Sequence, residues 1–194
     1  MKNQTSLMLY FLNMREIESC NNNTAKKALL RKDMSRKIKL YPNKDTESAI
    51  IVERIRASFD LEKEENILMF SPLKSEPDIT QLLALDNIAL PYIENNEMFF
   101  SRNKKLIKSP MGFMEPKHTP IAFDKALMFV PMLAFDSDLF RLGRGGGFYD
   151  RFISINRDRL YTVGVAFSIS KVESVCPDEF DQKLDMIITG DAIL

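Results

Sequence analysis

Four of the seven glycines in this 194-residue chain fall within five positions, at Gly143 and at residues 145–147. Successive glycines cost backbone entropy on folding, but they permit positive φ angles and a close approach of the main chain to a ligand. The cluster follows an apolar, strand-like segment at residues 127–130 and precedes a helix predicted from Gly147 to about Ile155. Backbone N–H groups at such a strand-to-helix turn form an anion nest, so the pattern predicts a phosphate-binding loop.

Two arginines, Arg141 just before this loop and Arg144 within it, add positive charge to it. The loop lacks the Lys-Ser or Lys-Thr of a Walker motif, and Phe148 stands where a dinucleotide fingerprint has its third glycine. It is therefore neither of these two nucleotide loops. A flexible surface turn is the alternative interpretation, because a glycine-rich sequence by itself carries little functional information.

Apolar patterns along the chain predict helices that alternate with strands. Helices are expected at Thr24 to Leu40, Glu47 to Phe59 and Pro77 to Leu85, and strands at residues 66–70, 88–92, 97–101, 127–130 and 161–167. This order predicts an α/β fold, a single three-layer α/β/α domain around a mostly parallel sheet. In such domains ligands bind beyond the carboxyl ends of the strands.

The first predicted helix is strongly basic. Between Thr24, a candidate N-cap, and Leu40 stand seven cations and one anion, 7 − 1 = +6, although the whole chain has a formal net charge of zero. A solvated helix face explains most such runs, and an anion site is the alternative. Nucleic-acid binding is not expected, because the total charge is neutral and aromatic residues do not alternate with the cations. Its apolar face is predicted to comprise Ala25, Leu29, Leu30, Met34 and Ile38.

Features of membrane and secreted proteins are missing from the sequence. No apolar run approaches the roughly 18 to 20 residues that a membrane-spanning helix needs. Arg15, Glu16 and Glu18 follow the first apolar segment, where a signal peptide would have its cleavage site. Cys20 and Cys176 form no CxxC pair, so neither zinc nor a disulfide is expected. We therefore expect a cytoplasmic protein with no membrane partner.

The residues around the glycine loop resemble the 5-formyltetrahydrofolate cyclo-ligase family. Its pattern, Pro-x-x-Ala-Phe-Asp followed by Arg-Leu-Gly-x-Gly-Gly-Gly-aromatic-Tyr-Asp-Arg, matches residues 131–136 and 141–151. Its first helix carries Lys-x-x-Leu-Arg, as do residues 27–31, and side chains at i and i+4 share one helix face. The resemblance covers residues 24–194, expected to form one catalytic domain. Residues 1–23 are interpreted as a poorly ordered N-terminal extension, with Met14 as an alternative translation start.

The resemblance implies ATP- and Mg²⁺-dependent closure of 5-formyltetrahydrofolate to 5,10-methenyltetrahydrofolate through a phosphorylated formyl group, with release of ADP and phosphate. Folate binding is assigned to Glu76, Arg144 and Phe148, catalysis to Arg144 and Tyr149, and Mg²⁺ binding to Asp150 and Asp185. ATP binding is assigned to Lys27, Arg31, Arg141, Gly143, Arg144, Gly145, Gly146, Gly147, Phe148 and Tyr149.

The chain also departs from the family pattern. Phe180 takes a position where many members carry histidine, and Gly146 one where animal members carry lysine, so the substrate end of the site is expected to differ from theirs. A nucleotide-binding regulator of the same fold, without folate chemistry, is the alternative function. Glu76 beside the phosphate-binding residues argues against it. The protein is expected to be a monomer or a weak homodimer.

Overall fold

The computed structural model describes residues 23–103, 105–108, 114–117 and 119–194. The predicted N-terminal extension therefore lies outside the described residues except for Asn23, as do Met14 and Cys20. The described helices are residues 23–40, α2 (Lys44–Ser58) and α3 (Phe148–Asn156), with short 3₁₀ segments η1 (Thr80–Ala84), η2 (Arg157–Arg159) and η3 (Ser168–Ser170). None of the helices in these residues is long and apolar enough to cross a membrane.

A six-stranded sheet in the order β10-β9-β6-β1-β2-β3 forms the centre of the molecule. Neighbouring strands are parallel except for β3, which forms an antiparallel hairpin with β2. The predicted mostly parallel α/β sheet is confirmed. Two further pairs, β4-β5 and β7-β8, lie outside this sheet. The strands are β1 (Ile67–Leu68), β2 (Ile88–Glu94), β3 (Glu97–Ser101), β4 (Leu106–Lys108), β5 (Met114–Pro116), β6 (Ala126–Pro131), β7 (Ala134–Phe135), β8 (Arg141–Leu142), β9 (Leu160–Val165) and β10 (Met186–Ile188).

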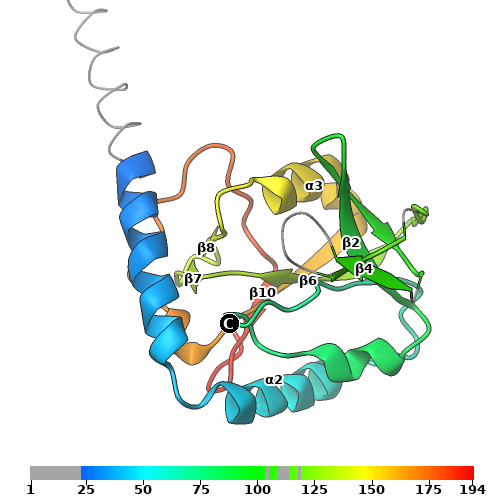
Figure 1. Ribbon diagram of the computed structural model, residues 1–194, viewed down its shortest axis with the longest axis horizontal. Coiled ribbons are helices and arrows are strands. Elements are labelled where there is room, and N and C mark those ends of the chain that lie inside the picture. Colours follow the sequence, from blue (N-terminus) through cyan, green and yellow to red (C-terminus); the bar gives the residue numbers. More distant parts are fainter. Residues whose placement is uncertain (1–22, 104, 109–113, 118) are drawn as a thin grey trace, which may run out of the picture.

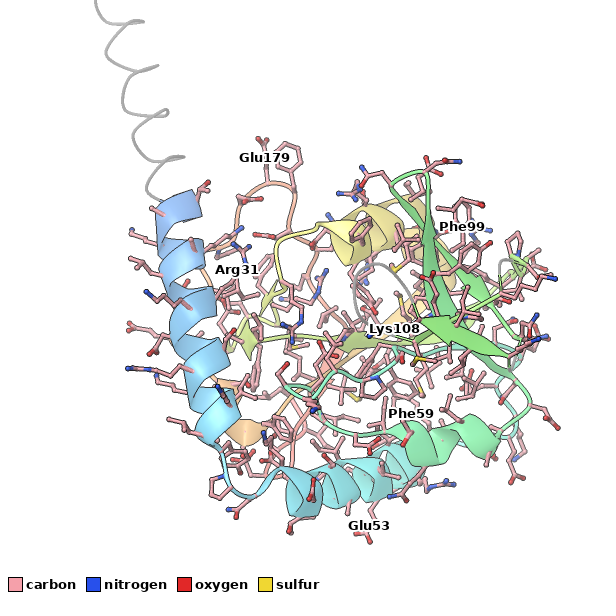
Figure 2. The ribbon with its side chains drawn as sticks, in the orientation of Figure 1. Arg31, Glu53, Phe59, Phe99, Lys108 and Glu179 are labelled. Carbon is pink, nitrogen blue, oxygen red and sulfur yellow. The ribbon has the colours of Figure 1, made fainter. Side chains whose placement is uncertain are left out.

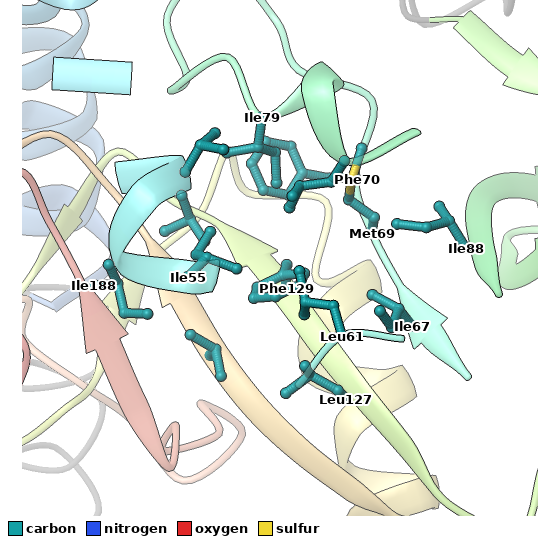
Figure 3. Close-up of a cluster of buried hydrophobic side chains, with 14 of the residues drawn as sticks. Ile55, Leu61, Ile67, Met69, Phe70, Ile79, Ile88, Leu127, Phe129 and Ile188 are labelled. Atoms are coloured by element: carbon teal, nitrogen blue, oxygen red, sulfur yellow. The ribbon is translucent and has the colours of Figure 1, made fainter. Parts of the chain in front are cut away.

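Alternating strand residues build a separate core on each face of the sheet. In β1, Ile67 packs in the cluster that contains Ile55 of α2, whereas Leu68 packs in the cluster that contains Ile153 of α3. Figure 3 shows Ile55 and Ile67 in the first of these clusters. Figure 1 shows α2 and α3 on opposite sides of the sheet. Because burying an aliphatic side chain contributes about 1.5–3 kcal/mol, both layers depend on this alternation.

The first helix, residues 23–40, stands beside the sheet instead of covering one of its faces (Figure 1). Met34 and Ile38 pack in one cluster with Leu142 of β8. Leu29, predicted on the apolar face, is 69% exposed. That prediction was wrong because the inward stripe of the helix includes the polar Lys27. Thr24 was also wrongly predicted as the N-cap, since residue 23 is already helical.

The segment predicted as a helix from Pro77 to Leu85 forms only the short η1. The Asp78 carboxylate accepts hydrogen bonds from the Thr80 N–H (2.9 Å) and the Thr80 hydroxyl (2.6 Å), and the Asp78 N–H donates to the Ser48 hydroxyl (2.9 Å). Such local side-chain bonds compete with an α-helical backbone. β4, β5, β7, β8 and β10 were not predicted, because two or three residues are too few to show an alternating pattern.

Candidate active site

A cavity of about 950 Å³ lies at the carboxyl ends of β1 and β6, where the strand order reverses. The chain continues from β1 to β2 on one side and returns to β6 on the other side of β1. Phe70, which follows β1, and Pro131, which ends β6, line the cavity. Ligands of open α/β sheets bind at such switch points, so this cavity is the candidate active site.

The glycine loop connects β8 to α3 and forms part of the cavity wall. Gly145 (φ +99°) and Gly147 (φ +65°) have left-handed backbones, which side chains other than glycine adopt at a cost. The Arg31 Nε donates to the Gly143 carbonyl at 2.9 Å. A Cβ atom on Gly145 would lie 3.5 Å from the Arg31 guanidinium carbon. The predicted convergence of the first helix and the glycine loop is therefore present, and Figure 2 shows Arg31 pointing away from its helix toward the interior.

Arg141, which is buried, connects the loop to the C-terminal part of the chain. Its guanidinium forms an ion pair with the Asp150 carboxylate at 2.9 Å and donates to the Gln182 carbonyl at 3.0 Å. The Asp150 carboxylate also accepts the Gln182 N–H at 3.1 Å. Asp150 is thus fixed at the first turn of α3 and lines the cavity.

Lys27 is held between two carboxylates of the same C-terminal segment. Its Nζ lies 2.6 Å from the Asp178 carboxylate and also forms an ion pair with Asp181. Desolvation lowers the pKa of Lys27, but the two hydrogen bonds outweigh it and raise the pKa above its ordinary value. Neither aspartate was predicted as a partner of Lys27, and the acidic run at residues 178–185 was the only available signal.

We call Lys27, Arg31, Arg141, Asp150, the glycine loop and residues 178–182 the loop end of the cavity. The strand end consists of Glu76, the side chain of Arg144, which reaches it from the glycine loop, and an apolar wall from β2 and β3. Figure 1 shows β2 on the side of the molecule opposite the first helix. That wall was not predicted as part of the site, because its side chains follow an ordinary strand pattern. It comprises Pro91, Ile93 and Met98.

Glu76 and Arg144 form an ion pair at the strand end. The Arg144 Nε donates to one Glu76 carboxylate oxygen at 3.2 Å, and its Nη2 donates to the Ser75 hydroxyl. Glu76 is buried, and its other oxygen accepts the Leu73 N–H at 2.9 Å. The Arg144 side chain is 44% exposed and belongs to the glycine loop, so the pair connects both ends of the cavity.

Tyr149 lies at the start of α3 and lines the same cavity. Desolvation raises the pKa of its phenol well above the ordinary value, and the negative charge of Glu76 adds to this increase, while Arg141 opposes it. The phenol therefore stays protonated and can donate a hydrogen bond.

Asp185, which was predicted to bind Mg²⁺ together with Asp150, is engaged in a separate set of contacts. Asp185 precedes β10, and its carboxylate pairs with the Arg157 guanidinium at 3.0 Å. It also accepts the N–H and the hydroxyl of Thr162, both at 2.7 Å. Desolvation raises the pKa of Asp185, but the bonds from Thr162 and Arg157 outweigh it and lower the pKa. Asp185 does not line the cavity, and within the described residues no group of three or more His, Cys, Asp or Glu side chains could hold a metal ion.

Comparison with known proteins decides the family. The sequence model of the 5-formyltetrahydrofolate cyclo-ligase family matches residues 23–190. The chain belongs to this family. A 5-formyltetrahydrofolate cyclo-ligase from Mycoplasma genitalium is 28% identical over 125 residues, which cover 64% of this chain and 72% of the relative.

Two solved structures of 5,10-methenyltetrahydrofolate synthetases have a similar fold. A 5,10-methenyltetrahydrofolate synthetase from Aquifex aeolicus matches with a TM-score of 0.72 and 26% identity, over 86% of this chain and 91% of that one. One from Mycoplasma pneumoniae matches with a TM-score of 0.67 and 21% identity, over 84% of this chain and 98% of that one, and shows the shared fold. The predicted family, the fold class and the prediction of an enzyme are confirmed.

The glycine at position 146, where the resemblance gives animal members a lysine, has a structural consequence at the loop end. A Cβ atom on Gly146 would lie 2.8 Å from the Phe148 ring, which is too close for the ring to stay in place. The Arg151 guanidinium lies over that ring at 5.0 Å from its centroid. Glycine at position 146 therefore allows Phe148 to pack against the loop backbone, where a lysine would displace it.

Proposed function

We propose that this cyclo-ligase family member catalyses the ATP- and Mg²⁺-dependent conversion of 5-formyltetrahydrofolate to 5,10-methenyltetrahydrofolate, with release of ADP and phosphate. The supporting observation is that one cavity joins a cationic glycine loop to the Glu76–Arg144 pair. We further propose that it acts in the cytoplasm, as a monomer or weak homodimer, on a small-molecule substrate without nucleic-acid or membrane partners.

The loop end suits the triphosphate of ATP. Arg31 donates its Nε–H to Gly143, and among the described residues no carboxylate lies within ion-pair distance of it. Its two Nη groups are thus available to phosphate oxygens. Lys27 and Arg141 are already fixed by carboxylates, so little side-chain entropy would be lost when they meet a phosphate. Loop N–H groups at the start of α3 would complete the binding site.

Asp150 would hold Mg²⁺ together with phosphate oxygens and water. Mg²⁺ prefers one or two carboxylates plus substrate phosphates to an all-protein cage, so Asp150, which lines the cavity beside the phosphate loop, fits it. When bound, the ion would neutralise negative charge on the transferring phosphoryl group.

The strand end would bind the folate, with its formyl group directed toward Arg144. The formyl oxygen attacks the γ-phosphorus and ADP leaves. The neighbouring folate nitrogen then attacks the formyl carbon and loses its proton to solvent. The carbon–oxygen bond breaks last, and phosphate leaves with the former formyl oxygen. Arg144 and protonated Tyr149 would stabilise charge on the oxygen that is transferred.

The test is near-ultraviolet absorbance of the methenyl product after the protein is mixed with 5-formyltetrahydrofolate, Mg²⁺ and ATP. We expect the absorbance to rise only when ATP is present, and an ATP-free mixture is the control. Saturable ATP binding without a rise would favour the regulator that lacks folate chemistry. Absence of both would overturn the assignment of the glycine loop.

A further inference from the structure

An exposed aromatic ring lies at the loop end of the cavity. Phe180 lines the cavity, yet it is 74% exposed. Single exposed apolar residues are common on protein surfaces and need no explanation alone. Phe180 differs because the segment that carries it is tightly held.

Ion pairs and hydrogen bonds hold residues 178–182 in place at both ends of the segment. Asp178 and Asp181 pair with Lys27, and the backbone of Gln182 bonds to Arg141 and Asp150. Inside the segment, the Phe180 N–H donates to the Asp178 carboxylate at 3.0 Å. In Figure 2 the neighbouring Glu179 lies at the tip of this loop, between the first helix and α3. The loop thus presents the ring at a fixed place beside the cavity.

The other aromatic side chains of the cavity are less exposed than Phe180. Phe70 is 1% exposed and belongs to the core, Phe148 lies beneath the Arg151 guanidinium, and Tyr149 is desolvated near Glu76. Phe180 also lies in the chain between Asp178 and Asp181, the two partners of Lys27, on the side where the phosphates are proposed to bind. A planar group attached to those phosphates would therefore meet the Phe180 ring before any other aromatic ring of the cavity.

We propose that Phe180 stacks on the purine base of the bound nucleotide and contributes to its affinity. This inference rests on the proposed binding of ATP at the loop end. A base that stacks on an aromatic ring gains affinity with little dependence on its hydrogen-bonding groups. Phe180 would therefore favour nucleotides over phosphates that lack a base, while other triphosphates with a purine would also bind.

The chain contains no tryptophan, so Phe180→Trp introduces a single fluorescent reporter at this position. We expect ATP with Mg²⁺ to quench its emission saturably, and inorganic tripolyphosphate to leave most of the emission unchanged. By calorimetry, Phe180→Ala should bind ATP roughly tenfold more weakly and tripolyphosphate with unchanged affinity. Leu29→Ala, which removes an exposed apolar side chain outside the cavity, is the control and should change neither.

Two results would overturn the stacking. In the first, Phe180→Ala binds ATP as tightly as the wild type. In the second, tripolyphosphate quenches the tryptophan as strongly as ATP does. If the wild type binds ATP and forms the methenyl product while either result is obtained, only the role of Phe180 fails. If the wild type does not bind ATP, the proposed function fails together with it.

Discussion

The two ends of the cavity differ in how they are built. At the loop end, three separate stretches of the chain bring cations and carboxylates together, and Lys27 is bound to two aspartates and Arg141 to one. At the strand end, one ion pair, Glu76–Arg144, stands against an apolar wall. Charge networks suit a highly charged ligand, whereas an apolar wall with one buried carboxylate suits a flat, mostly uncharged ring. The comparison teaches that loop-end substitutions should weaken ATP binding and strand-end substitutions folate binding.

Asp150→Asn should have the largest effect and should show that the loop end is needed for chemistry. Loss of the charge beside the phosphates is expected to lower ATP-dependent turnover by about 10²–10³-fold. The amide oxygen can still accept bonds from Arg141 and the Gln182 N–H, so the fold should survive. Initial rates of product absorbance and a thermal melt would test this. Near wild-type activity would remove Asp150 from the site.

Glu76→Gln tests the strand end and should affect folate binding instead of ATP binding. Replacing a buried carboxylate by an amide removes the charge opposite Arg144, and losing a charge-assisted hydrogen bond costs about 1.5–3 kcal/mol. We expect the KM for 5-formyltetrahydrofolate to rise about 10- to 100-fold while the KM for ATP changes little. A rise in the KM for ATP alone would reverse the assignment of the two ends.

Lys27→Met should raise the KM for ATP by about tenfold and leave the KM for folate unchanged, because the lost lysine faces only the loop end. Lys37→Met is a matched control on the same helix, since Lys37 pairs with Asp33 on the exposed surface. Equal KM values for ATP in the two variants would exclude Lys27 from nucleotide binding.

Acid should lower the stability of the folded protein by weakening the Lys27–Asp178 ion pair at the loop end, and this is the smallest of the predicted effects. The hydrogen bond from Lys27 lowers the pKa of Asp178 below its unfolded value of about 3.9. The folded state therefore binds fewer protons than the unfolded state. The stabilisation is present above that unfolded value and is lost as the pH falls through the folded pKa. Urea unfolding between pH 3 and 6 should show a shallower acid decline for Lys27→Met than for the wild type. Parallel declines would contradict this pairing.

The loop end could be predicted from sequence because its residues are recognisable by type. Glycines with positive φ are hard to replace, and cations four residues apart on a helix share a face, so Gly145, Gly147, Lys27 and Arg31 stood out. Arg144 and Glu76 were also expected at one site, and the structure joins them.

Other features were invisible because they depend on pairing over long sequence distances. Asp178, Asp181 and Asp185 look alike in the sequence, and only the fold commits the first two to Lys27 and the last to Arg157. The apolar wall from β2 and β3 carries no chemical signature. Leu29 was misplaced because the burial of Lys27 rotates the inward face of the first helix.

The most direct test of the account asks whether the two ends deliver their ligands to one reaction. The measurement is a single turnover of 5-formyltetrahydrofolate that carries ¹⁸O in its formyl group, with mass analysis of the released phosphate. If the formyl oxygen attacks the γ-phosphorus of ATP, the phosphate should contain the label. Product formation with unlabelled phosphate would contradict the account, because ATP would then have been hydrolysed without contact with the folate.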